Sequence, residues 1–120
     1  MIGSACPCGS SLPYDACCGP LHRGARQAST AVELMRSRYS AYAVGHLDYV
    51  FRTWHPRTRP ADLSLEGGPT WVGLTVGEYG EDWVDYAAAW IQAGETGVLR
   101  EHSRFEQRAG RWFYVDGDIS

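Results

Sequence analysis

The sequence predicts an α+β domain with a small metal-binding module at its N-terminus. Three observations point to this fold: four cysteines occur only near the N-terminus, two helical segments follow, and four strand candidates fill the rest of the chain. Helices that precede strands joined by short turns are typical of α+β domains with an antiparallel sheet. We therefore place a cysteine module at residues 1–22 and an α+β domain at residues 29–120.

The cysteines form two close pairs, Cys6 with Cys8 and Cys17 with Cys18. Neighbouring Cα atoms are about 3.8 Å apart, short of the roughly 4.4 Å at which ordinary disulfides begin, so a bridge within the second pair would be strained. Four thiolates can instead hold one Zn²⁺ tetrahedrally and leave no open position for a catalytic water. We predict one structural zinc ion. The alternatives are a redox or disulfide pair, or His22 replacing one cysteine as a ligand.

Composition and charge exclude several classes of protein. The 120 residues are 44% hydrophobic, enough for one modest core, and the net charge of -3 gives no basic stripe for nucleic acid. The five tryptophans and seven tyrosines therefore indicate core packing rather than base stacking. We find no apolar run near the roughly 18 residues of a membrane span and no secretory signal. Free thiols suit a reducing compartment, so we expect a cytoplasmic protein.

The first long helix is delimited by its capping residues. Thr30 and Glu33 form a capping box, and Gly45 is suited to end the helix after Val44. Arg38 projects from the middle of the apolar face, which also carries Ala31, Leu34, Met35 and Tyr42, with Tyr39 at its edge and Ser37 and Ser40 pointing away. A buried arginine needs a carboxylate or carbonyl partner, unless it extends to the rim with only its stem buried.

A shorter helix and four strands complete the domain. The helix is expected over Leu47–Trp54, where His55 and Pro56 end it. A loop leads to Pro69, and the strands are expected over Trp71–Glu78, Trp83–Ile91, Val98–Glu106 and Arg111–Asp116. The turn-like segments between them are short, which predicts an antiparallel meander.

The third strand carries polar residues on both of its faces. Alternation places Glu101 and Ser103 on one face, between Leu99 and Phe105, and Arg100, His102 and Arg104 on the other. The first face is apolar at both ends, so we expect it to lie against the helices and His102 to lie at the surface. Glu101 would then be a buried carboxylate, and we predict an ion pair between Glu101 and Arg38.

Two parts of the sequence resemble known families. Cys6-Pro7-Cys8-Gly9-Ser10, followed by Tyr14 and Cys17-Cys18-Gly19, resembles the SEC-C motif, the zinc-binding module of the translocase ATPase SecA. The remainder resembles the YchJ family of small bacterial SEC-C proteins, in the segments Leu34–Tyr42, Thr53–Pro56, Glu101–Phe105 and Trp112–Gly117. The resemblance implies a nuclear transport factor two-like cone, with helices over a curved antiparallel sheet, and implies no established activity. Lysines between the cysteine pairs, which SecA has, are absent here, so binding of SecB or ribosomes does not carry over.

The sequence leaves two functions open. The first is a non-enzymatic, zinc-binding adaptor that meets a protein partner through the cysteine module, with an ion pair filling the cone. The second is a small-molecule binder, or a dehydratase or isomerase, whose cone is an open pocket. In that case Glu101 or His55 would be the general base and Arg38 would hold an anionic group. The candidate pocket residues are Arg38, Tyr42, Trp54, His55, Glu101 and Ser103.

Overall fold

The helices precede the strands, as the sequence predicts. The computed structural model describes residues 4–120. In chain order the elements are η1 (Tyr14–Ala16), α1 (Cys18–His22), α2 (Ala31–Val44), α3 (Leu47–Arg52), β1 (Thr70–Tyr79), β2 (Trp83–Gln92), β3 (Glu95–Arg108) and β4 (Arg111–Ile119). The strands form one antiparallel sheet in the order β1-β2-β3-β4, which confirms the meander. Within residues 4–120, no helix is long and apolar enough to cross a membrane.

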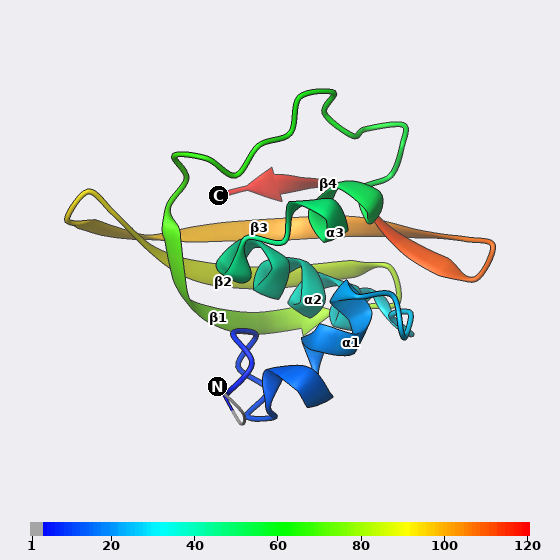
Figure 1. Ribbon diagram of the computed structural model, residues 1–120. Coiled ribbons are helices and arrows are strands. Elements are labelled where there is room, and N and C mark those ends of the chain that lie inside the picture. The colour runs from blue at the N-terminus through cyan, green and yellow to red at the C-terminus, as the bar shows by residue number, and fades with distance from the viewer. Residues whose placement is uncertain (1–3) are drawn as a thin grey trace.

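Helix α2 lies across one face of the sheet, with α3 beside it and the cysteine module at the β1 side (Figure 1). Its predicted capping is confirmed: Thr30 Oγ1 accepts a hydrogen bond from the Glu33 amide at 3.1 Å, and Gly45 ends the helix in a left-handed conformation. The helix is buried on two sides. Met35 and Arg38 face the sheet, whereas Ser37 and Ser40 are fully buried away from it, under Tyr49 of α3 and the cysteine module.

Helix α3 ends at Arg52, two residues before the predicted end at Trp54. The chain leaves the helix there because it begins to pair with β4. The His55 amide donates to the Tyr114 carbonyl at 2.8 Å, and the Tyr114 amide donates to the Thr53 carbonyl at 2.9 Å. Trp54 and Tyr114 form an isolated parallel bridge between these two bonds. The segment that follows α3 is therefore hydrogen-bonded to β4, which fixes the end of α3 to the sheet.

Strand β3 is longer than expected because tight hairpins join it to both neighbours. Ala93 and Gly94 have φ of 52° and 82°, and Ala109 and Gly110 have φ of 50° and 79°. Two consecutive residues with positive φ form the type I′ turn, which suits the twist of paired strands. Each turn needs only two residues, so β3 starts at Glu95 and extends over 14 residues.

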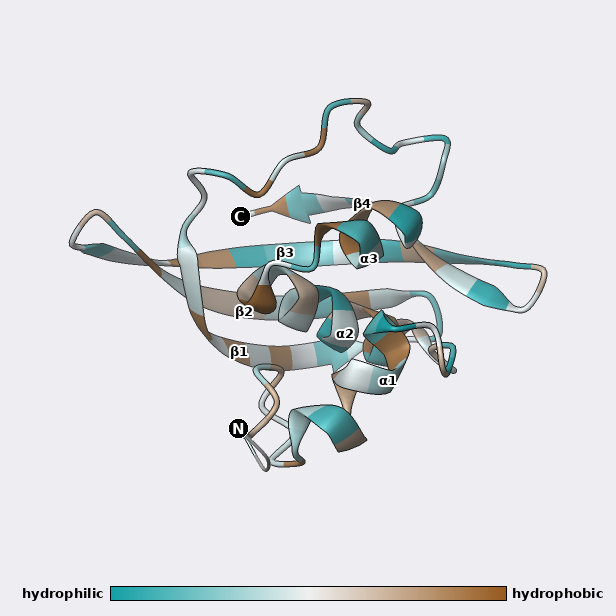
Figure 2. Ribbon diagram, in the orientation of Figure 1, coloured by the Kyte–Doolittle hydropathy of each residue, from teal (hydrophilic) through white to brown (hydrophobic). Residues whose placement is uncertain are grey.

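The inner face of β3 carries polar side chains under the helices. Glu101, Ser103 and Phe105 are buried at 8%, 1% and 5% exposure, so the predicted orientation of this strand is confirmed. Figure 2 shows the middle of β3 as hydrophilic, between two hydrophobic stretches of the same strand. His102 lies on the other face, where it donates to Asp85 at 2.6 Å. A polar floor beneath helix α2 is thus built into the sheet.

Candidate metal centre and ligand cavity

The four cysteine sulfurs gather in one cluster. The Sγ atoms of Cys6, Cys8, Cys17 and Cys18 all lie within 4.8 Å of one another, and none forms a disulfide. Cys17 Sγ lies 3.6 Å from Cys8 Sγ and 3.9 Å from Cys18 Sγ. Four sulfurs arranged tetrahedrally around one Zn²⁺ at about 2.3 Å are about 3.8 Å apart. The cluster therefore has the size and the donors of a tetrahedral thiolate centre, and it could hold a metal ion.

The backbone before the second cysteine pair turns back to bring the pairs together. Gly9 adopts φ of 82°, and the Cys6 amide donates to the Leu12 carbonyl at 2.8 Å. Ser10 Oγ lies 3.1 Å from Cys17 Sγ. Hydrogen bonds, first that with Cys18 and then those with Ser10 and Cys17, lower the pKa of the Cys8 thiol to about 4. A thiolate, the form that binds a metal cation, is therefore favoured at Cys8, whereas the contact with Cys8 raises the pKa of the Cys18 thiol.

The cysteine module is hydrogen-bonded to helix α2. Arg36 Nη1 donates to the Cys8 carbonyl at 2.8 Å, and the Cys6 sulfur lies 3.4 Å from Ser40 Oγ. These contacts explain why Ser40, which the helical pattern turns away from the sheet, is nevertheless buried.

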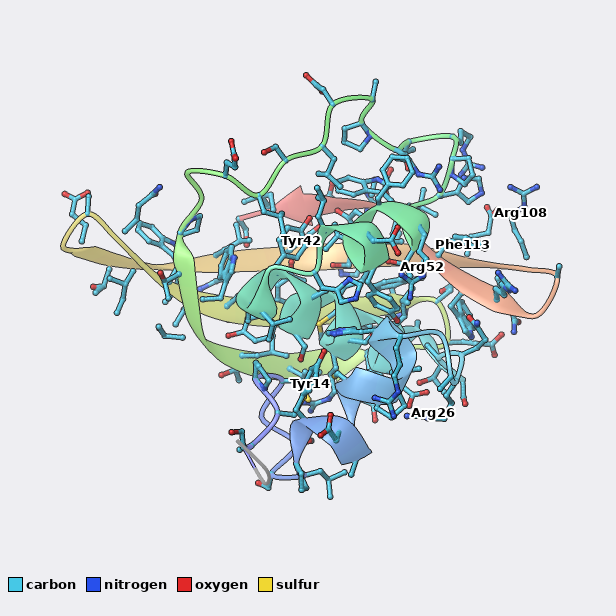
Figure 3. The ribbon with its side chains drawn as sticks, in the orientation of Figure 1. Tyr14, Arg26, Tyr42, Arg52, Arg108 and Phe113 are labelled. Carbon is cyan, nitrogen blue, oxygen red and sulfur yellow. The ribbon has the colours of Figure 1, made fainter. Side chains whose placement is uncertain are left out.

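His22 joins the module to the cone and does not enter the cysteine cluster. Its Nε2 donates to the Ser37 carbonyl at 2.8 Å, and its Nδ1 accepts from the Tyr14 hydroxyl at 2.5 Å. Tyr14 is labelled in Figure 3. Both ring nitrogens are therefore engaged, so the alternative of His22 as a ligand does not hold in this structure. Burial lowers the pKa of His22, which favours the neutral ring that these two bonds require.

A cavity of about 240 Å³ lies between α2 and the sheet. Of the six candidate pocket residues, the five that line it are Arg38, Tyr42, Trp54, Glu101 and Ser103. Tyr42 is labelled in Figure 3. The rest of the wall is mostly aromatic and includes Tyr39, Trp71, Tyr86, Phe105 and Tyr114. The cone is therefore an open pocket and not a filled core.

His55 lies outside this cavity. It follows Trp54 in an extended segment, where consecutive side chains point in opposite directions, so Trp54 faces the cavity and His55 faces away. His55 Nε2 instead donates to Glu106 at 2.8 Å, and its Nδ1 accepts from the Arg57 amide at 3.0 Å. The expectation that His55 is a general base in the cone is therefore not supported by its position.

Arg38 is buried in the cavity wall, with only 6% of its surface exposed. Its Nη1 donates to the Val50 carbonyl and to Thr53 Oγ1, both at 2.8 Å. The guanidinium carbon lies 5.1 Å from the centre of the Trp54 ring and 4.6 Å from that of Tyr114. The predicted ion pair with Glu101 is wrong, because the end of α3 and two aromatic rings hold the guanidinium instead. Extension of Arg38 to the rim is also excluded by its burial.

Glu101 is held by two tyrosines. Tyr86 and Tyr114 each donate a hydroxyl hydrogen bond to its carboxylate at 2.6 Å. Burial, together with the Glu101 charge, raises the pKa of both tyrosines, so they remain protonated donors. Gly117 leaves the room for this arrangement, because a Cβ at that position would overlap the Glu101 carboxylate. Sequence reasoning missed the tyrosines, since only the strand register sets Tyr86 opposite Glu101.

Two polar atoms of the cavity wall have no partner. Ser103 Oγ and Trp54 Nε1 are buried and make no hydrogen bond with the residues that the structure describes. Buried polar groups in proteins are ordinarily paired, because an unmade hydrogen bond costs about 1–3 kcal/mol. Both residues line the cavity, so its wall contains two buried polar groups without a hydrogen-bond partner among the described residues.

Comparison with known proteins identifies the family. The model of the middle NTF2-like domain of YchJ matches residues 30–117. A UPF0225 protein of Deinococcus radiodurans is 49% identical over 112 residues, which cover 92% of this chain and 86% of the relative. A UPF0225 protein of Streptomyces coelicolor is 44% identical over 117 residues, which cover 95% of this chain and 94% of the relative.

Solved structures agree with this assignment. The solution structure of a SEC-C motif containing protein from Rhodopseudomonas palustris matches with a TM-score of 0.84 and 31% identity, over 96% of this chain and 98% of that chain. The crystal structure of a SEC-C motif containing protein from Psychrobacter arcticus matches with a TM-score of 0.78 and 25% identity. The match covers 98% of this chain and 83% of that chain. The chain therefore belongs to the YchJ family of UPF0225 proteins, with an NTF2-like domain and the fold of SEC-C motif proteins.

Proposed function

We propose that this protein is a zinc-stabilised binding protein whose cone holds a small organic molecule. The observation that carries the proposal is the open cavity, where the unpartnered Ser103 Oγ and Trp54 Nε1 lie beside a buried arginine. A concave, mostly apolar pocket with a few converging polar groups is typical of small-molecule sites. A filled cone was expected of the adaptor and an open pocket of the small-molecule binder, so the cavity favours the second function.

The metal has a structural role in this proposal. Cys6, Cys8, Cys17 and Cys18 would hold one Zn²⁺ with thiolates only, which leaves no position for water or substrate. Apart from its cysteines, the module buries few apolar side chains, so metal binding would supply much of its folding free energy. A protein partner for the module remains a prediction.

The contacts of Glu101 favour binding over catalysis. Each of its carboxylate oxygens already accepts a hydroxyl hydrogen bond, from Tyr86 or from Tyr114. Such a carboxylate is a fixed part of the wall, and the remaining candidate base, His55, lies outside the cavity. We therefore assign Glu101 to the shape and charge of the pocket, without a catalytic step.

The test replaces two adjacent alanines of β2 by leucine, one at a time. Ala88 lines the cavity, whereas Ala87 faces the other side of the sheet. A library of monocyclic organic compounds is screened by protein-observed NMR, with the indole N–H signal of Trp54 as reporter. Compounds should shift this signal in the wild type and in Ala87→Leu but not in Ala88→Leu, whose larger side chain fills the cavity. Absence of any binder, or equal binding by both variants, would refute the proposal.

A further inference from the structure

The size of the cavity limits the molecule that it can hold. An apolar protein cavity of about 150 Å³ is large enough to bind benzene. The present cavity of about 240 Å³ has room for one such ring and a short substituent. Its wall includes the rings of Tyr39 and Trp71, which meet edge to face with centres 6.4 Å apart. Walls of this kind suit a planar ring, because aromatic pairs prefer edge and offset contacts.

The hydrogen bonds of Arg38 leave one edge of its guanidinium without a partner. Both recorded bonds come from Nη1, so Nε and Nη2 make none with the described residues. Arg38 lines the cavity, and neither nitrogen is among the fully buried atoms without a partner, so this edge of the guanidinium keeps some accessible surface. Nε and Nη2 together form a planar fork that matches the two oxygens of a carboxylate.

The charge of Arg38 is also without an ion pair. No carboxylate among residues 4–120 forms a salt bridge with it, although its burial lowers the pKa of the guanidinium. A buried charge is costly unless an opposite charge accompanies it. An anionic group on the bound molecule would supply that charge at the free edge.

Glu101 sets a limit on the charge of the bound molecule. It lies on β3, in the sheet wall of the cavity, whereas Arg38 lies on α2, in the helix wall. A molecule that spans the two walls can place one carboxylate on Arg38, but a second carboxylate would be repelled by Glu101. An uncharged group at that end, beside Ser103 and Glu101, would avoid this repulsion.

We propose that the ligand of the cone is a small aromatic monocarboxylate, with its carboxylate on Nε and Nη2 of Arg38 and its ring between helix α2 and the sheet. This inference rests on the proposed function, because it names the class of molecule that the same cavity binds. In this proposal Arg38 determines specificity for a carboxylate, and Glu101 disfavours molecules that carry a second one.

The first test compares probes on the wild-type, zinc-loaded protein. Benzoate, neutral benzyl alcohol of similar shape, and the dicarboxylate terephthalate are titrated by NMR. A charge-assisted bidentate contact predicts that benzoate binds at least about tenfold more tightly than benzyl alcohol. Terephthalate should bind at least about tenfold more weakly than benzoate, because of Glu101. Equal affinities for benzoate and benzyl alcohol would overturn the ligand class and leave the proposed function intact.

The second test uses Arg38→Met, which keeps an apolar stem and removes the guanidinium. The preference for benzoate over benzyl alcohol should disappear, while the affinity for benzyl alcohol stays the same. Arg100→Met, on the outer face of β3, is the matched control and should bind both probes as the wild type does. Unchanged benzoate affinity in Arg38→Met would overturn the proposal. If Arg38→Met does not fold, the comparison of benzoate with benzyl alcohol on the wild type decides the proposal. If the wild type binds no compound at all, the proposed function itself is refuted.

Discussion

Tyr86 stands directly across from Glu101 in the pairing of β2 with β3, and its hydroxyl donates to the Glu101 carboxylate at 2.6 Å. Tyr114 donates to the same carboxylate from β4. Three neighbouring strands are therefore tied together on the inner face of the sheet by one buried charge. This triad forms the floor of the cavity.

Removing one of these hydroxyl groups should destabilise the domain. Hydrogen bonds to charged groups contribute about 1.5–3 kcal/mol, so Tyr86→Phe should lower the free energy of unfolding by about that amount. Urea denaturation at neutral pH measures the change. Tyr79→Phe is the control, because Tyr79 is 57% exposed, and it should change stability by less than about 0.5 kcal/mol. Equal effects of the two substitutions would show that the Tyr86 hydroxyl adds nothing.

Gly117 should be intolerant of even one added methyl group. A Cβ at this position would overlap the Glu101 carboxylate, so Gly117→Ala must push that side chain away from its two tyrosines. Overpacking of this kind costs about 1–3 kcal/mol. Gly73→Ala, also in the sheet, is the matched control, since its Cβ would meet only Ala89 Cβ at an ordinary 3.8 Å. Thermal or urea unfolding should separate the two variants, and similar stabilities would contradict the packing argument.

Metal content should depend on each of the four sulfurs. The protein purified without added metal should contain one zinc ion per chain, and Cys8→Ser should contain none and lose stability, since structural zinc contributes on the order of 10 kcal/mol in small sites. Ser10→Ala removes a contact with Cys17 Sγ but keeps all four thiols, so it should retain the metal. Atomic emission spectrometry and a thiol assay provide the measurement. A metal-free wild type with disulfides would support the redox alternative instead.

Acid should destabilise the join between module and cone through His22. Burial, and to a lesser degree the charges of His46 and Arg52, lower the pKa of folded His22, whereas the unfolded value is about 6.5. Below pH 6.5 the unfolded chain therefore binds a proton that the folded chain does not. Stability is full above that pH and falls below it, by up to about 1.4 kcal/mol per pH unit.

His22→Gln removes this titration while its amide can still donate to the Ser37 carbonyl. Urea denaturation between pH 5.5 and 7.5, with bound zinc verified throughout, should show a steeper loss of stability in the wild type than in the variant. Parallel curves for the two proteins would mean that His22 does not take up a proton on unfolding in this range.

Local rules predicted the elements and the orientation of β3. Thr30 and Glu33 fixed the start of α2 because capping depends on residues three apart. Glu101 and Ser103 were placed on the inner face because alternation along a strand is a local property. The clustering of the cysteines was likewise predictable, since two close pairs separated by a flexible turn can converge on one point.

Contacts between distant segments could not be predicted in this way. A helical pattern assigned one buried face to α2, yet Ser37 and Ser40 are fully buried because α3 and the cysteine module cover a second face. The partner of Arg38 depends on where α3 presents the Val50 carbonyl, which no periodicity reveals. His55 was expected in the pocket together with Trp54, but only Trp54 lines the cavity, while His55 binds Glu106 outside it.

The double burial of α2 has a consequence for how this family can change. The same helix presents Arg36 to the cysteine loop and Arg38 to the cavity, so any shift of the helix that adapts it to one neighbour also moves its contacts with the other. We expect the metal module and the cone to diverge together among related sequences, rather than to be exchanged as independent cassettes. A chimera that joins the module of one distant relative to the cone of another should therefore be less stable than either parent.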